Sequence, residues 1–182
     1  MRILRYPLFF IPFILLVCGV NTDKPVYPLF TLFRPVQTPA LLTVKPVELW
    51  TIDNQYKIEF EISYYITSQE PEFMGYNLLT STTSTSAQNS GLGTVLYLPS
   101  GIEPSFLHVG AKPSTAASSK ITQRVTDYRA APSPLPFELC EKYFFRLQSV
   151  TSNGIRSNTG NEVGSCAILD TTRCPKGTVC NP

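Results

Sequence analysis

The pattern that most restricts the fold is an alternation of apolar and polar residues near the middle of the first half. Its apolar positions are Ile58, Phe60, Ile62, Tyr64 and Ile66. A repeat of two turns successive side chains to opposite faces of an extended chain, which predicts a strand with one buried and one solvated face. No window of eleven residues repeats near 3.6, as an amphipathic helix requires. The sequence therefore predicts an all-β protein.

Further short strands are expected along the chain, at residues 74–78, 94–98, 121–128, 142–151 and 155–167. The strongest is 142–151, which Asn153-Gly154, a typical hairpin dipeptide, joins to the last strand. Residues 80–90 and 112–119 have few apolar side chains to bury, which favours loops. The sequence thus predicts an antiparallel β-sandwich over residues 43–168 with long middle loops.

Two motifs give this sandwich a family likeness. One runs from Leu135 through Leu139 and Tyr143 to the hairpin, and the other is Phe73-Met74-Gly75-Tyr76-Asn77-Leu78. They resemble the last two strands and the third strand of a fibronectin type III or immunoglobulin-like domain. The resemblance implies that the Tyr143 hydroxyl hydrogen-bonds to backbone just upstream. The second strand lacks the tryptophan usual in the family, and Trp50 lies earlier in the chain.

The N-terminus has the layout of an export signal. A short basic region, residues 1–5, precedes an apolar run from Tyr6 to Val17 that ends at Cys18. The run is too short for a spanning helix, which needs about 20 residues. Residues 1–17 are therefore expected to be a removed signal peptide. A short uncleaved anchor is the alternative.

The segment Leu15-Leu16-Val17-Cys18 resembles the lipobox of bacterial lipoproteins, in which the cysteine thiol receives a diacylglycerol. Val17 departs from the small residue usual before that cysteine, as in the looser lipoboxes of spirochaetes. The whole chain resembles small lipoproteins of unknown function from spirochaetes such as Leptospira. The resemblance implies lipidation of Cys18 and attachment to a membrane. The alternative is an ordinary cysteine in the apolar region, with cleavage a few residues later.

Residues 18–42 are expected to be a Pro-rich, lipid-attached tether. This segment carries large apolar side chains, Val26, Tyr27, Leu29, Phe30, Leu32 and Phe33. Leaving such side chains in water is unfavourable by about 1.5–3 kcal/mol each. We expect the segment to pack on the domain as an extended strand, and contact with a membrane interface is the alternative.

Four further cysteines, Cys140, Cys166, Cys174 and Cys180, predict two disulfides in an exported chain. Structural zinc is the competing interpretation, but it favours close C-x-x-C pairs, which the sequence lacks. A two-residue Asn153-Gly154 turn sets Glu141 opposite Cys166, and one bulge would bring Cys140 opposite it. The hairpin therefore predicts the pairs Cys140–Cys166 and Cys174–Cys180, with residues 169–182 as a disulfide-closed tail.

Charge argues against nucleic acid as a partner. Of the 15 Lys and Arg residues, Arg2 and Arg5 fall in the signal, and the 13 that remain balance 13 Asp and Glu residues. A neutral chain has no basic field to hold phosphates.

Catalytic patterns are weak. His108, the single histidine, lies between apolar residues with no nucleophile motif nearby. Glu59 and Glu61 share a strand face that is better read as solvated than as a glycosidase pair. Exposed aromatics such as Tyr65 and Phe144 could mark a binding face.

These observations predict a non-catalytic protein with no cofactor, metal or small-molecule substrate. We expect a lipid-anchored lipoprotein of the cell envelope, in the outer membrane, that binds another protein or acts in adhesion. The alternative is a structural subunit of an envelope assembly with no soluble ligand. Fold alone does not choose between them.

Overall fold

The computed structural model describes residues 36–50, 55–85, 94–129 and 133–182. The chain divides into two units, Met1–Arg34 and Pro35–Pro182, and all of the described residues belong to the second. Its described residues form strands and two short 3-10 turns, η2 (Ala117–Ser119) and η3 (Thr171–Arg173), and no α-helix. The predicted signal peptide and most of the predicted tether lie outside the described residues.

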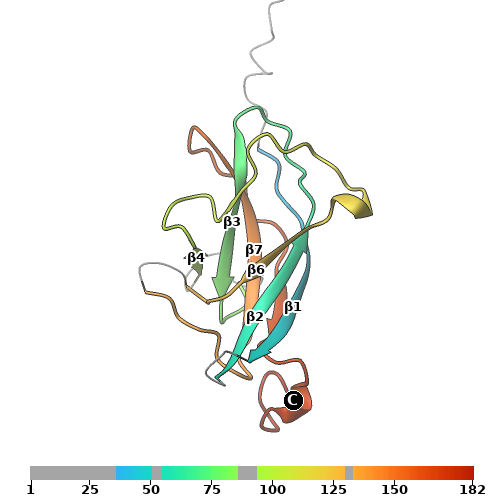
Figure 1. Cartoon of the computed structure of the whole chain (residues 1–182), viewed down its shortest axis with the longest axis vertical. Coiled ribbons are helices and arrows are strands. Elements are labelled where there is room, and N and C mark those ends of the chain that lie inside the picture. The colour runs from blue at the N-terminus through green and yellow to red at the C-terminus, as the bar shows by residue number, and fades with distance from the viewer. Residues whose placement is uncertain (1–35, 51–54, 86–93, 130–132) are drawn as a thin grey trace, which may run out of the picture. The chain divides into compact units, whose positions relative to one another are not determined.

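Two antiparallel sheets form a sandwich-like arrangement (Figure 1). The first sheet has the order β1-β2-β6, with bounds Leu41–Trp50, Tyr56–Tyr64 and Ile121–Val125. The second has the order β4-β3-β7-β8, with bounds Val95–Tyr97, Phe73–Ser81, Lys142–Thr151 and Val163–Cys166. A short strand β5 (Phe106–Leu107) also pairs with β3. The all-β prediction is confirmed.

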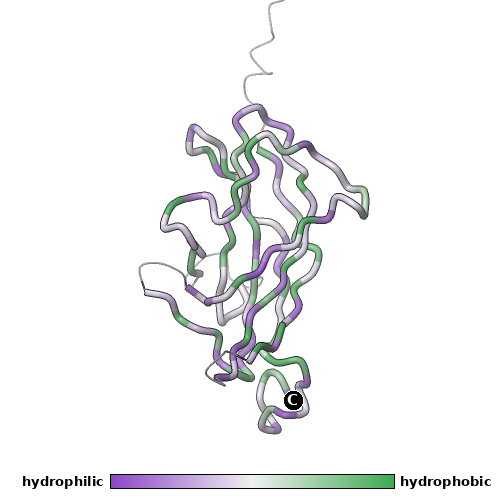
Figure 2. Tube along the Cα trace, in the orientation of Figure 1, coloured by the Kyte–Doolittle hydropathy of each residue, from purple (hydrophilic) through white to green (hydrophobic). Residues whose placement is uncertain are grey.

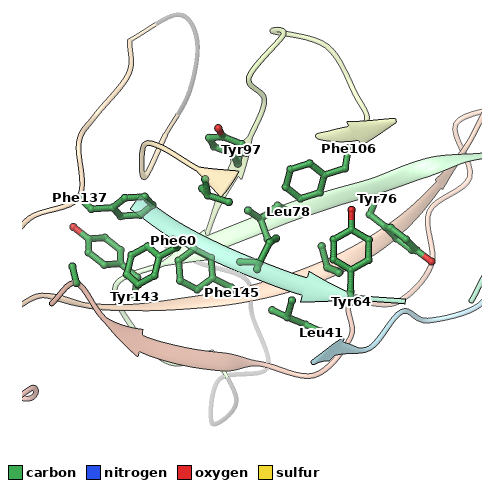
Figure 3. Close-up of a cluster of buried hydrophobic side chains, with 14 of the residues drawn as sticks. Leu41, Phe60, Tyr64, Tyr76, Leu78, Tyr97, Phe106, Phe137, Tyr143 and Phe145 are labelled. Carbon is green, nitrogen blue, oxygen red and sulfur yellow. The ribbon is translucent and has the colours of Figure 1, made fainter. Parts of the chain in front are cut away.

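Period two explains where the core lies. The apolar residues of β2 face inward, and Phe60, Ile62 and Tyr64 are fully buried. Figure 2 shows hydrophobic and hydrophilic positions alternating along the strands. Aromatic rings dominate the core and gather in two groups (Figure 3). Phe60 packs edge-on against Phe137 and Phe145, with ring centroids 4.7 and 5.0 Å away. Tyr64 packs against Tyr76 in the same way at 5.3 Å.

The segment before β1 is joined to the second sheet. The side chain of Asn161 accepts a hydrogen bond from the Leu41 N–H and donates one to the Leu41 carbonyl, both at 2.8 Å. Gly160 lies so close to Pro39 that a Cβ would overlap the Pro39 carbonyl oxygen. The described part of the predicted tether, residues 36–42, therefore packs on the domain, as expected for an extended segment.

The last predicted strand is shorter than expected. Only Val163–Cys166 pairs regularly with β7, and nearer the turn a single bridge joins Val150 to Arg156. The hairpin turn has three residues and not two, because the Thr151 N–H donates to the Ile155 carbonyl. Gly154, with a φ of +80°, adopts the left-handed conformation that ends such a turn.

The predicted disulfide pairing is wrong. The bonds join Cys140 to Cys174 and Cys166 to Cys180, with Cα–Cα distances of 5.5 and 5.9 Å. The register explains the error, because Lys142 lies opposite Cys166. The expected bulge would have moved Cys166 from a place opposite Glu141 to one opposite Cys140. The irregular segment 157–162 instead moves Cys166 one residue the other way, away from Cys140. Cys140 lies before β7 in a turn with a φ of +63°, where the returning C-terminal chain brings Cys174.

Candidate functional site

Tyr143 makes the contact that the family resemblance implied. It is buried at the start of β7, and its hydroxyl accepts a hydrogen bond from the Glu138 N–H at 3.0 Å. Its ring packs edge-on against Phe137 at 4.8 Å. The pKa of Tyr143 is raised, chiefly by burial, so the hydroxyl stays protonated. This arrangement ties the chain before β7 to the core and is structural.

His108 has a structural contact that the sequence did not predict. Its Nε2 lies 2.7 Å from the hydroxyl of Tyr64, a fully buried residue of β2. The His108 ring also lies against Tyr76. Burial lowers the pKa of His108 and raises that of Tyr64, so both groups are neutral near pH 7. No serine, cysteine or carboxylate hydrogen-bonds to the ring among the described residues, and the pair joins the 108–113 loop to the core.

The two glutamates of β2 lie on the outer face of the first sheet. Glu59 forms ion pairs with Lys57 at 3.6 Å and Arg124 at 3.8 Å, and neither distance is that of a strong contact. These neighbours leave only 8% of the surface of Glu59 exposed, so this position is less solvated than the alternation of the strand predicted. Glu61 lies opposite Lys45 and Arg124. The pair is thus part of a charged sheet face.

The aromatic residues expected to mark a binding face are only partly exposed. Tyr65 follows β2, and Phe144 lies in β7. The ammonium group of Lys142 lies over the Phe144 ring, 5.4 Å from its centroid. Neither ring offers a broad open surface.

The largest exposed aromatic side chain lies at the end of β1. Trp50 is 71% exposed and lies opposite Tyr56, the first residue of β2. The two rings meet edge to face with centroids 5.3 Å apart. Both residues share the core-facing side of the first sheet with Ile58, but they extend beyond the core. Trp50 is therefore in contact with Tyr56 and yet open to solvent.

Residues of the C-terminal segment support this aromatic pair. The Arg173 guanidinium lies over the Tyr56 ring at 5.7 Å and pairs with Glu48 at 3.3 Å. Glu48 also accepts a hydrogen bond from the Leu169 N–H at 3.0 Å. The pKa of Glu48 is lowered most by the nearby Tyr56 hydroxyl and next by the Leu169 N–H. The Tyr56 hydroxyl lies near the carboxylate without forming a hydrogen bond of normal geometry. The carboxylate is thus ionised at neutral pH.

The two disulfides make the C-terminal segment, residues 166–182, a compact knot. Ile168, Cys174 and Cys180 form a small buried cluster of their own, against which Cys140 and Cys166 pack. Asp170 caps the η3 turn by accepting from the Thr172 N–H at 3.0 Å. The knot also presents Leu169 and Val179 to solvent. We call Trp50, Tyr56, Glu48, Arg173 and Leu169 the knot-end surface.

Sequence reasoning left the place of Trp50 open and missed its supports. A tryptophan on the core-facing side of a strand predicts burial, and only the length of β1 beyond the core exposes it. Glu48 and Arg173 are 125 residues apart, so no local pattern joins them.

Two clefts are weaker candidates for a binding site than the knot-end surface. One, of about 510 Å³, lies between residues 68–73 and 110–113. The other, of about 380 Å³, lies beside Tyr128 and Tyr143 with Glu138 and Glu141 at its edge. In the described residues, no group of three or more His, Cys, Asp or Glu side chains is arranged to hold a metal ion. None of the described helices is long and apolar enough to cross a membrane.

Comparison with known proteins yields one match. A family model described as LIC11073-like, a name taken from a Leptospira protein, matches residues 17–182. No curated protein and no solved structure matches the chain significantly. The two disulfides indicate an extracytoplasmic protein, since such bonds persist in oxidising compartments.

Proposed function

We propose that this chain, which belongs to the LIC11073-like family, is a lipid-anchored envelope protein that binds another protein without catalysis. The observation that carries the proposal is the exposed Trp50 of the knot-end surface. Trp, Tyr and Arg are the residues that most often dominate the energy of protein interfaces. All three occur together here, supported by an ion pair and a disulfide-closed segment.

A fibronectin type III-like domain is part of the proposal. In an immunoglobulin-like scheme, strands A, B and E share one sheet, and C′, C, F and G share the other. The orders β1-β2-β6 and β4-β3-β7-β8 agree with these two sets. The contact of Tyr143 with Glu138 resembles the tyrosine corner of such domains. These domains commonly bind through their loop-bearing ends, where the knot-end surface lies.

Export and lipid attachment supply the setting. The basic and apolar residues before Cys18 favour export, and the lipobox-like segment favours a diacylglycerol on Cys18. Two disulfides agree with an envelope location. We assign the protein to the outer membrane as part of the same proposal.

The geometry of β1 argues for the knot end as the contact surface. The chain enters the domain at Leu41, and Trp50 lies nine residues further along the same strand. Nine steps of about 3.3 Å separate these ends by roughly 30 Å. A domain tethered through Cys18 would therefore carry Trp50 on the end remote from the tether, open to a partner.

A binding comparison tests the proposal. The full chain and its Trp50→Ala variant are immobilised, and retention of proteins from an envelope extract is measured. Val109→Ala is the matched control, because Val109 is equally exposed, at 71%, near the chain's point of entry. We expect a partner retained by the wild type and by Val109→Ala. Its affinity for Trp50→Ala should be at least about 30-fold lower, the loss that corresponds to the roughly 2 kcal/mol of an interface hot spot.

Equal retention by all three proteins would refute the knot-end surface as the binding site. Isolation of the chain only in a stoichiometric envelope assembly, independent of Trp50, would support the structural subunit instead. Denaturation midpoints of the variants check that each one is folded.

A further inference from the structure

The end of the domain opposite the knot carries a separate set of exposed aliphatic side chains. Ile102, Leu107, Val109 and Ile155 are between 54% and 71% exposed. Aliphatic side chains exposed together on one part of a soluble domain are uncommon without a partner. We call these four residues the anchor-end patch.

Hydrogen bonds join the segments that bear this patch. The His108 N–H, next to Val109, donates to the Met74 carbonyl at 2.6 Å. The Ser152 N–H of the hairpin donates to the Glu72 carbonyl at 2.8 Å. Arg156 pairs with Glu103 through two contacts of 2.7 and 3.1 Å, which brings the hairpin to the loop that carries Ile102. The segments that bear the patch therefore meet near the first residues of β3.

The N-terminal segment enters the domain at the same end. The Gln37 N–H donates to Glu70 at 3.1 Å, and the Gln37 carbonyl accepts from the Ser149 hydroxyl at 2.7 Å. Val36, the first described residue, follows Cys18 by eighteen residues, a reach of at most about 60 Å. The tether therefore joins the domain at the end that bears the patch.

We propose that the anchor-end patch lies against the lipid surface and orients the domain, an inference that rests on the proposed lipid attachment of Cys18. Aliphatic side chains are the ones that a bilayer accepts most readily. Of the charges nearby, Glu103 is paired with Arg156 and Glu70 accepts from main-chain N–H groups, whereas Glu72 and Lys112 are exposed charges of opposite sign. The aromatic and cationic residues suited to a protein partner lie at the other end, around Trp50.

The chain supplies its own matched probe, because Trp50 is its single tryptophan. Wild type reports on the knot end, and the double variant Trp50→Phe, Val109→Trp reports on the patch. Each full chain is produced in an exporting host and reconstituted into vesicles of phosphatidylethanolamine and phosphatidylglycerol. Part of the lipid carries bromine on its acyl chains, which quenches tryptophan on contact. Intact mass identifies the lipid on Cys18 in the same samples.

We expect brominated lipid to remove most of the fluorescence at position 109 and little of that at position 50. Adding Ile155→Glu should restore fluorescence at position 109, whereas Leu169→Glu, an equally drastic change on the knot, should not. Absence of quenching at position 109 in lipidated, vesicle-bound protein would overturn the inference. Preferential quenching of Trp50 would overturn it too, because the domain would then be oriented the other way.

The mass measurement separates this inference from the proposed function. If the purified chain carries no lipid, lipid attachment is refuted. A chain that begins at Cys18, produced without residues 1–17 and with its two disulfides formed, is then coupled through the Cys18 thiol to a maleimide phospholipid. The same quenching comparison on this chain decides whether the patch contacts the membrane.

Discussion

Single side chains join segments of this protein that are distant in sequence. Tyr143 links the chain before β7 to the core through its hydroxyl, and His108 links the 108–113 loop to Tyr64. In both cases an aromatic ring fills space while one polar atom satisfies a buried partner, which is why neither can be exchanged for a purely apolar residue without loss.

Replacing Tyr143 by Phe should destabilise the protein by about 1 kcal/mol, the usual net contribution of one hydrogen bond. The ring contacts are retained, so the change isolates the contact with the Glu138 N–H. The denaturation midpoint in urea measures the effect. Tyr128→Phe is the control, since its ring lies 5.4 Å from that of Tyr143 and its hydroxyl makes no hydrogen bond among the described residues. An equal loss in both variants would contradict the assigned contact.

The His108 ring should make stability depend on pH. Burial lowers its pKa in the folded state, so its contribution is complete above the usual value of 6.5 and is lost as pH falls toward the folded-state pKa. Free energies of unfolding at neutral pH and at about pH 5.5 should therefore differ more for wild type than for His108→Gln. An identical pH dependence of the two proteins would show that the pKa of the ring does not differ between the folded and unfolded states.

At the scale of strands and turns, the last hairpin is where the prediction and the structure differ. Lys142–Thr151 was predicted with the bounds that β7 has, because its alternation is regular. The return strand has no such regularity: residues 157–162 keep only irregular backbone hydrogen bonds to β7, from Ser157 and Gly160, and also meet Pro39 and Leu41. The strand register deduced from the Asn153-Gly154 turn therefore does not hold as far along the hairpin as Cys166.

The interleaved disulfides should contribute unequally. Loop-entropy estimates give about 4 kcal/mol for Cys140–Cys174 and about 3 kcal/mol for Cys166–Cys180, which span 34 and 14 residues. Paired Cys→Ser variants of each bond, measured by chemical denaturation, check the order. Peptide mapping without reduction should recover Cys140 joined to Cys174. A Cys140–Cys166 peptide would instead restore the pairing predicted from the hairpin.

The Asn161 side chain should be an important link between β1 and the second sheet. Asn161→Ala removes two hydrogen bonds to the Leu41 backbone and should cost roughly 2 kcal/mol of stability. Hydrogen exchange at the Leu41 N–H should accelerate more than the loss of global stability explains. Asn158→Ala, at an exposed position three residues earlier, should leave both quantities unchanged.

At the scale of the whole molecule, β1 separates two ends with different chemistry. One end receives the N-terminal segment and bears exposed aliphatic side chains, and the other bears Trp50, Arg173 and the disulfide knot. The two proposals above assign a membrane to the first of these ends and a protein partner to the second.

The proposed lipid attachment at Cys18 would determine which end of the domain faces the membrane, and it is directly measurable. Radiolabelled palmitate should be incorporated into the wild-type chain and absent from Cys18→Ser. The variant Cys140→Ser, Cys174→Ser is the control, because it alters cysteines without touching the proposed site. Equal labelling of wild type and Cys18→Ser would refute lipidation at this position.

The sequence by itself determined the features that depend on short-range periodicity. Alternation along 58–66 and 142–151 predicted the two central strands and the faces that they bury, because a repeat of two has one structural solution. The Tyr143 contact followed from a resemblance carried by residues within a few positions of one another. An even number of cysteines sufficed to predict two disulfides, though not their pairing.

Only the tertiary structure decided which distant segments meet. The pairing of Cys140 with Cys174, the support of Tyr56 by Arg173 and the exposure of Trp50 all depend on how far each strand extends beyond the core. Local patterns carry no information about such lengths, because they arise from the packing of one sheet on the other. The candidate site is formed where β1, β2 and the C-terminal knot meet, and it therefore became visible only in the folded chain.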